Sequence, residues 1–488
     1  MLPAIACATL LTSCLLTGET SPVRPSPAPQ EPAGVPAAPQ AEPPASPALD
    51  PSVPARAGEL SVSWAHFDQL LLDRYALAPE GERGVLFLAR NRVLDGLAAE
   101  RGERISEQEL ARALAELEAQ LAQSGQDSLE TTLARSGLSR ATFEATLRRS
   151  LLQERLSRVA LGIPADREVS PQAQELWLDE QVGQRGVERF ARPFPEQGLA
   201  RVGADQWIQP GELAEVLRTQ VPAEEQREAL GQLLLLRALE KRLAARPPAE
   251  LEAAVEAEIA ARRAEAAKDP AYQGVPFEDL LAARGRDLIG LRRDPAVRVA
   301  ALASHVMRLE VPEERLESVY RGDQARFDDR IGAAVRARVL LLACGGPEGS
   351  PLPSVEQARA EAAELLPRLV SESAFQALAR ERSDDLLSRA RGGDLGFVTR
   401  GQDNVLAEVR AALFEAAQRG QKGLVGPLEL SGGLALLWVG ELRPTPPFAS
   451  LRGAIRRELE RRLLESILPS GAIQTYVDPQ LAAAAARR

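Results

Sequence analysis

The chain has 488 residues, of which 45% are hydrophobic and only 4% aromatic, and its formal net charge at pH 7 is −10. This length allows several domains, whose cores have to be built mainly from Ala, Leu and Val, a composition that favours helices. The acidic balance excludes the basic surface that nucleic-acid-binding proteins need, so we expect no nucleic-acid partner.

The first 18 residues have the character of a sorting segment rather than of a folded element. Residues 1–16 are mostly apolar, and residues 11–14 (LTSC) resemble a bacterial lipobox, whose cysteine is lipidated after cleavage. No Lys or Arg precedes the short apolar run, so a plain secretion signal or a chance cysteine remains an alternative. We expect a lipoprotein signal-like segment over residues 1–18, with Cys14 as the lipidation site.

Residues 19–57 are rich in Pro and Ala. Such a composition buries little apolar surface and favours the extended polyproline II conformation, at about 3.1 Å per residue. We expect a disordered linker there, able to hold a folded body on the order of 100 Å from a membrane. Because Cys7 and Cys14 precede the linker, Cys344 has no disulfide partner in the mature chain and is expected to be a buried apolar residue.

The sequence from about 58 to 333 predicts a duplicated helical unit, with one copy over 58–195 and the other over 196–333. Residues 129–137 (LETTLARSG) and 277–285 (FEDLLAARG) match step for step, and Val169 and Val311 each precede a further helix. Ser106 and Glu109 have the spacing of a capping box, which predicts a helix start. Chance similarity between helices of this composition remains the alternative to duplication.

The region over 334–443 has a different pattern, in which strands and helices alternate. The predicted elements are a buried strand at 335–342, helical segments over 354–382 and 406–414, a glycine-shaped turn at 391–397 that leads into a strand, a Gly-Pro turn at 426–427 and an apolar strand at 434–439. Paired glycines predict a backbone-shaped turn because glycine adopts positive φ at no steric cost.

This order of elements, together with four motifs, resembles the parvulin (rotamase) domain of peptidyl-prolyl cis-trans isomerases. The motifs are RARVLLL at 336–342, FQALARERSDD at 375–385, GGDLGF at 392–397 and GLVGPLEL at 423–430. The resemblance implies a small α/β domain with a central sheet that binds a proline-containing peptide.

Parvulins typically place one histidine in the first strand and another in the last, with their rings facing each other beneath the substrate proline. The corresponding positions here are Val339 and Ala435, and the chain's two histidines, His66 and His305, lie outside this region. The family's Cys-or-Asp position falls on Asp385, the candidate catalytic residue, for which a turn acid or helix cap is the alternative. Because prolyl isomerisation needs no covalent chemistry, these replacements predict weak or absent activity rather than another reaction.

The helical region and the C-terminal segment over 444–488 resemble the chaperone part of SurA- and PrsA-type envelope foldases. In that family a helical unit leads into a parvulin domain, and a C-terminal helix returns to pack on the helical part. Here a helix at 451–468 and a short strand at 476–478 are expected to do so. The resemblance implies an α+β chain, with duplicated helical chaperone units and one parvulin domain, lipid-anchored in the bacterial cell envelope and facing the periplasm or the exterior.

Three functions remain open from the sequence. The leading hypothesis is a cell-envelope folding factor that binds unfolded or proline-containing polypeptides as a chaperone, with weak or absent isomerase activity. The second is an active isomerase with an atypical pocket, in which Asp385 acts and Leu413, Phe414 and Leu424 contact the peptide. The third is a scaffold lipoprotein with one fixed partner. We expect no cofactor and no metal, because the histidines lack ligand spacing and no nucleotide-binding motif opens a helix.

Overall fold

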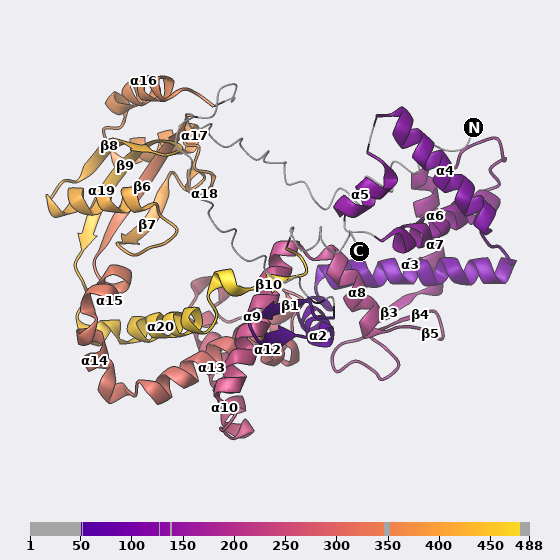
Figure 1. Ribbon diagram of the computed structural model, residues 1–488, viewed down its shortest axis with the longest axis horizontal. Coiled ribbons are helices and arrows are strands. Elements are labelled where there is room, and N and C mark those ends of the chain that lie inside the picture. The colour runs from indigo at the N-terminus through magenta and orange to yellow at the C-terminus, as the bar shows by residue number, and fades with distance from the viewer. Residues whose placement is uncertain (1–49, 51, 126, 137–138, 346–351, 479–488) are drawn as a thin grey trace, which may run out of the picture. The chain divides into compact units, whose positions relative to one another are not determined.

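The computed structural model describes residues 50, 52–125, 127–136, 139–345 and 352–478, and it has an α+β fold (Figure 1). It divides into two compact units: a helical unit, Met1–Leu302 with Ile467–Arg488, and a sheet unit, Ala303–Ser466. The predicted lipidation site Cys14 and nearly all of the predicted linker lie outside the described residues. Within the described part of the chain, none of the helices combines the length and the hydropathy that a bilayer-spanning segment requires.

The helical unit contains mainly helices, joined by short strands. Its elements are β1 (Ala55–Ala57), β2 (Leu60–Val62), α2 (Trp64–Tyr75), α3 (Pro79–Arg101), α4 (Glu107–Gln123), α5 (Leu129–Ser136), α6 (Arg140–Ala160), α7 (Pro171–Arg185), β3 (Val187–Arg189), β4 (Ala200–Val202), β5 (Gln206–Ile208), α8 (Pro210–Gln220), α9 (Ala223–Arg242), α10 (Pro248–Ala266), η1 (Pro270–Tyr272), α11 (Phe277–Ala282), α12 (Leu288–Arg293), the first part of α13 (Pro295–Glu310), η3 (Ser470–Ala472) and β10 (Gln474–Thr475). The capping box predicted at the start of α4 is confirmed, because Ser106 Oγ accepts from Glu109 N and Glu109 Oε2 accepts from Ser106 N, at 3.3 and 2.8 Å.

The described part of the helical unit contains two three-stranded antiparallel sheets, one of which joins strands from opposite ends of the chain. Their strand orders are β10-β1-β2 and β3-β4-β5. β3 follows α7 of the first predicted repeat but pairs with the hairpin β4-β5 of the second. The hairpin β1-β2, whose first strand lies in the last three residues of the predicted linker and whose second opens the first repeat, instead takes β10 from the C-terminal segment. Helix packing is crossed in the same way, since α3 packs on β4 and β5 while α9 packs on β1 and β2. The domain boundaries at 195 and 333 stay a prediction.

The C-terminal segment is anchored in the helical unit by an aromatic residue. The ring of Tyr476 lies edge-on to Trp64 and Phe67, with centroids 4.8 and 6.0 Å away. Tyr476 N also donates to Pro54 O over 2.9 Å. Edge-to-face aromatic pairs contribute about 0.5–1.5 kcal/mol beyond their buried area. The strand predicted at 476–478 is therefore displaced: it is Gln474–Thr475, and Tyr476 follows it as an anchor.

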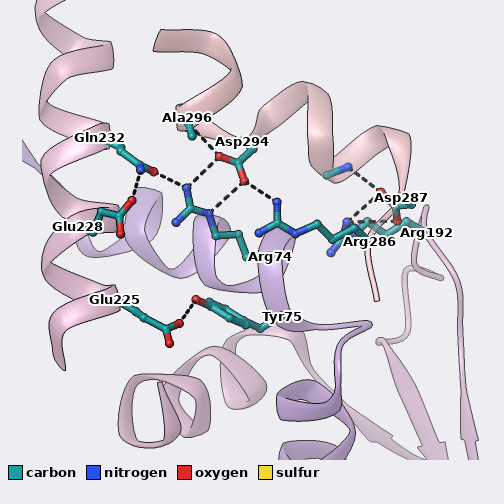
Figure 2. Close-up of polar contacts among 11 residues, drawn as sticks. Arg74, Tyr75, Arg192, Glu225, Glu228, Gln232, Arg286, Asp287, Asp294 and Ala296 are labelled. Atoms are coloured by element: carbon teal, nitrogen blue, oxygen red, sulfur yellow. Dashed lines mark hydrogen bonds and ion pairs between the residues drawn. The ribbon is translucent and has the colours of Figure 1, made fainter. Parts of the chain in front are cut away.

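Helices α10 to α13 surround a smaller apolar cluster of their own, and their junction with α2 is polar (Figure 2). Arg74 of α2 donates to both carboxylate oxygens of Asp294, at 3.0 and 2.9 Å, and both side chains are nearly buried. Asp287 accepts two hydrogen bonds from Arg192 Nη1, at 3.0 and 3.2 Å. The nearly buried Arg74–Asp294 pair thus links α2 to the residue that joins α12 and α13.

The sheet unit contains a single four-stranded sheet with helices on both faces. Its elements are the remainder of α13, α14 (Glu313–Gly322), α15 (Gln324–Ile331), β6 (Ala334–Ala343), α16 (Val355–Leu365), η2 (Leu366–Arg368), α17 (Glu372–Arg382), α18 (Leu386–Arg389), β7 (Asp394–Thr399), α19 (Ala407–Gln418), β8 (Gly423–Leu430), β9 (Gly433–Arg443) and α20 (Phe448–Ile467). The strand order is β7-β6-β9-β8, antiparallel throughout. The strands predicted at 335–342 and 434–439 are confirmed as the two central strands.

Side chains of β6 alternate between the two faces of this sheet. Val335, Ala337 and Val339 point into the apolar cluster beneath α19, which defines the α19 face. Leu340 and Leu342 point the other way, into the cluster beneath α16 and α17. Cys344 is buried in this second cluster, as predicted. Alternation with period two is what a central strand covered on both sides requires.

The turn predicted at 426–427 is wrong. Gly426 and Pro427 lie inside β8, where the register with β9 shifts between Val425 and Leu428. They form a bulge, and the chain reverses instead at 431–432. Proline has no N–H to donate, so it is tolerated here because β8 lies at an edge of the sheet.

Candidate functional site

Val339 and Ala435, the positions at which the resemblance places histidines, lie on the adjacent central strands of the sheet. β6 and β9 pair so that Val339 faces Leu437 and Leu341 faces Ala435. Val339 and Ala435 are therefore diagonal neighbours on the α19 face, a relation that separates residues by about 7–8 Å. Val339 is 8% exposed and Ala435 is fully buried, both within the same apolar cluster. The two side chains offer neither a hydrogen-bond donor nor an acceptor.

The paired glycines place the backbone directly beside the first of these positions. Gly392 and Gly393 have φ values of 66° and 75°, so the predicted backbone-shaped turn is confirmed. Val339 N donates to Gly393 O over 2.8 Å. A Cβ atom on Gly393 would lie only 2.1 Å from Val339 O. Glycine is required here for its conformation and for this close approach together.

Ser383 and Asp384 complete the hydrogen bonding of β6 beyond the end of its pairing with β7. Leu341 N donates to Ser383 Oγ over 3.1 Å, and Asp384 N donates to Leu341 O over 2.8 Å. Asp384 Oδ2 accepts from Ala343 N over 2.8 Å. These backbone groups would otherwise lie unpaired at the edge of the strand. The sequence analysis missed this role, whose only signal is a pair of short polar side chains directly after a helix.

Asp385, the candidate catalytic residue, is half-buried and caps the short helix α18. Its carboxylate accepts hydrogen bonds from Leu387 N, at 3.4 Å, and from Ser388 Oγ. Asp385 N donates to Ser383 Oγ over 3.3 Å. These contacts correspond to the helix-cap alternative. A catalytic role for Asp385 stays a prediction.

Asp394 ties the glycine turn to β6 through charge. Its carboxylate accepts from Gly396 N and from Arg336 Nη2, each at 2.7 Å, and Arg338 Nη1 lies 3.8 Å away. Burial opposes ionisation of this carboxyl, but the two hydrogen bonds and the guanidinium charges outweigh it and lower the pKa of Asp394. Arg338, nearly buried, also donates to Glu372 over 2.9 Å. The network fixes the turn against β6 and α17.

The three residues predicted to contact a peptide do not all lie on the same face of the sheet. Leu413 is fully buried and Phe414 is 2% exposed, both on α19 and within the cluster on the α19 face. Leu424 is half-buried on β8 and packs with Trp438 on the opposite face. The guanidinium of Arg400 lies 4.3 Å above the Phe414 ring and covers it further. Leu413 and Phe414 thus attach α19 to the sheet, and peptide contact by these three residues stays a prediction.

Comparison with known proteins identifies this region. Residues 327–430 match the family model described as the PPIC-type PPIASE domain. The putative peptidyl-prolyl cis-trans isomerase YacD of Bacillus subtilis (strain 168) is 34% identical over 157 residues, 31% of this chain and 46% of that protein. Foldase protein PrsA 2 of Bacillus cereus is 29% identical over 100 residues, 20% of this chain and 33% of that protein. The crystal structure of the PrsA peptidylprolyl isomerase from Bacillus anthracis aligns with a TM-score of 0.26 at 16% identity, covering 53% of this chain and 94% of that one.

The chain spans less than half the length of the curated relatives it matches. The residues matched by the family model run from α15 through β8 and include Val339, the glycine turn and Asp385. Both central strands and the turn between α18 and β7 lie where the resemblance implied. Residues 327–430 therefore belong to the PPIC-type, or parvulin-type, family of peptidyl-prolyl isomerase domains, in a form that contains no histidine.

Proposed function

We propose that this protein is a folding factor of the bacterial cell envelope that binds unfolded polypeptide as a chaperone and has weak or no isomerase activity. The observation that carries the proposal is a parvulin-type domain with its sheet and glycine turn, in which buried Val339 and Ala435 stand at the two positions where the resemblance places histidines. The names of the curated relatives, a foldase and a putative isomerase, support a role in folding.

Isomerase activity and chaperone activity make different demands on the protein. Rotation about a prolyl amide crosses a barrier of about 18–20 kcal/mol, and a catalyst has to stabilise the amide as its double-bond character is lost. Val339 and Ala435 supply no hydrogen bond for that purpose. Holding an unfolded chain needs only accessible apolar surface, worth about 25 cal/mol per Å², and moderate affinity so that clients leave again.

The test compares the wild-type chain with the Val339→His/Ala435→His double variant in the cis/trans isomerisation of a short X-Pro peptide. The wild type is expected to show no isomerase activity while it keeps an unfolded outer-membrane-type client soluble. Clear wild-type turnover would instead favour an isomerase with an unusual pocket.

Asp385 is tested with a matched control. Asp385→Ala removes the carboxylate, whereas Ser388→Ala breaks one hydrogen bond of the same cap and leaves the carboxylate in place. Wild-type turnover that falls with Asp385→Ala alone would assign the carboxylate a catalytic role. An equal fall in both variants would show that only the cap of α18 matters.

The envelope location is proposed from Cys14, which lies outside the described residues. Cys14→Ser is expected to abolish incorporation of labelled palmitate and to release the protein from the membrane fraction. Cys7→Ser is the control and should change neither. A single partner that no unfolded client displaces would favour the scaffold alternative over the chaperone.

A further inference from the structure

We propose that the groove between α4 and α6 of the helical unit binds one amphipathic helical segment of an unfolded client. This inference rests on the proposed chaperone function and assigns it a binding site. The segment is a short helix with one apolar face and with an acidic and a basic side chain one turn apart.

The groove is formed by two antiparallel helices. Arg148 of α6 pairs with Glu107 at the start of α4 over 2.8 Å, and Arg140 at the start of α6 lies 3.8 Å from Glu118 near the end of α4. Between the two helices lies a cavity of about 710 Å³. Ligand sites typically enclose about 300–1,000 Å³, so the cavity admits several apolar side chains.

The lining has the length and spacing of a slot for a third helix. Lining positions recur every three or four residues from Glu109 to Gln123 on α4 and from Leu147 to Arg158 on α6. At a rise of 1.5 Å per residue the α4 wall extends for about 21 Å, which matches a helix of about 14 residues. The floor is formed by Leu117 and Leu147, which are 4% and 2% exposed, and its accessible apolar surface comes from half-buried Ala113 and Leu151. Helices that bind in grooves place apolar anchors at i, i+3 or i+4, and i+7 on such a floor.

The charged residues at the rim of the groove determine which charges the bound helix should carry. On the α6 side Arg158 pairs with Glu154 over 2.6 Å, and Arg155 is bonded to Glu109. On the α4 side Arg112 and Glu116 are both exposed and lie one helical turn apart, and neither has an ion pair among the residues that the structure describes. A docked helix that offers an acid and a base at the same spacing complements both.

The first test blocks the groove in the full chain. The probe is a fluorescein-labelled 14-residue peptide with leucines on one helical face and one Glu and one Lys four residues apart, followed by anisotropy. Ala113 is half-buried and lines the groove, so Ala113→Trp is expected to weaken binding at least tenfold. Ala115 is exposed on α4 and outside the lining, so Ala115→Trp is the matched control and should bind as the wild type does. Equal affinity of the two variants would overturn the proposal.

The second test does not depend on filling space. Two peptides differ only in the order of Glu and Lys, and the wild type is expected to prefer one of them by about two- to five-fold, as exposed ion pairs allow. The Arg112→Glu/Glu116→Arg variant keeps the net charge and the helix length and should reverse that preference. An unchanged preference would overturn the proposed pairing of the bound helix with Arg112 and Glu116.

A client assay separates this inference from the proposed function. If Ala113→Trp loses the peptide and also loses suppression of client aggregation, the groove is the client site. If it loses the peptide but still keeps the client soluble, the groove inference is refuted and the chaperone proposal survives. If the wild type binds the peptide but holds no client, the proposed function fails.

Discussion

Replacing Asp294 with Ala should destabilise the helical unit by about 3–5 kcal/mol, the usual cost of leaving one partner of a buried ion pair uncompensated. The Asp294 side chain is 4% exposed and receives two hydrogen bonds from Arg74, itself 10% exposed. Arg286 Nη1 lies 3.4 Å away, and Ala296 N at the start of α13 donates to the same carboxylate over 2.9 Å (Figure 2). The substitution leaves two guanidinium groups facing an apolar methyl.

The double variant Arg74→Met/Asp294→Leu isolates the cause. It removes both charges and keeps much of the volume, so its cost is expected to be smaller than that of Asp294→Ala alone. A double variant as unstable as the single one would show that Asp294 acts through packing or through α13 rather than through its charge.

The pH dependence follows from the same contacts. Burial raises the pKa of Asp294, but the hydrogen bond and the charge of Arg74 outweigh it, and the pKa is lowered from the ordinary 3.8. A carboxyl with a depressed folded pKa contributes its full stability above the unfolded value and loses it as the pH falls through the folded one. The difference in stability between wild type and Asp294→Ala should therefore be constant from about pH 5 to 8 and shrink below about pH 4.

Tryptophan fluorescence resolves the unit concerned. Trp64, Trp177 and Trp207 lie in the helical unit and Trp438 in the sheet unit, so a Trp438→Phe background reports on the helical unit alone. Unfolding in urea then gives the free energy of that unit. A loss below about 1 kcal/mol for Asp294→Ala would refute the reasoning, since so small a value is typical of exposed pairs.

Three further outcomes are expected. Burial raises the pKa of Asp73, so ionising this carboxyl costs the folded state stability as the pH rises above 3.8. Asp73→Asn should therefore be more stable than the wild type in urea at pH 7, and the difference in stability should shrink towards pH 4. Lower stability of the variant at pH 7 would contradict this. Gly393→Ala adds a Cβ that would lie 2.1 Å from Val339 O at a φ of 75°, so we expect a loss of about 3 kcal/mol or more in the sheet unit, followed by Trp438 fluorescence; a loss under about 1 kcal/mol would show that the turn relaxes. Tyr476→Ala removes a ring held between Trp64 and Phe67 and should cost the helical unit about 2–4 kcal/mol, with an unchanged unfolding midpoint for Trp438 as the control.

Elements that depend on local sterics and periodicity were predictable from the sequence. The central strands follow from β-branched and leucine runs, and the turn at Gly392 and Gly393 follows from the freedom of glycine at positive φ. The helix start at Ser106 follows from two side chains three residues apart. In each case the residues that form the structure are adjacent in the chain.

The composition of the candidate site was not predictable in the same way, because it depends on strand register. Leu424 and Val425 are consecutive on β8, so they point to opposite faces, and the cluster on the α19 face receives Val425 rather than Leu424. Pairing with β9 and the bulge at Gly426 and Pro427 determine which of these two side chains points toward α19. The same dipeptide is as consistent with a turn as with a bulge, and only the partner strand distinguishes them.

The pairing of the short strands is the feature of the fold that local sequence patterns specify least. Arg56 and Gln474, which are 418 residues apart, lie opposite each other in β1 and β10 and share a side-chain hydrogen bond of 2.7 Å. Strands of two or three residues carry almost no β-propensity signal, so long-range packing determines which strands pair. β3 of the first predicted repeat pairs with the hairpin of the second, and the hairpin β1-β2 is completed by β10 from the C-terminal segment, so neither sheet is completed within one predicted repeat. Because β10 pairs with β1, the C-terminal segment is part of the folding unit that begins at Ala55. A substitution at Tyr476 is therefore expected to lower the stability of the helical unit.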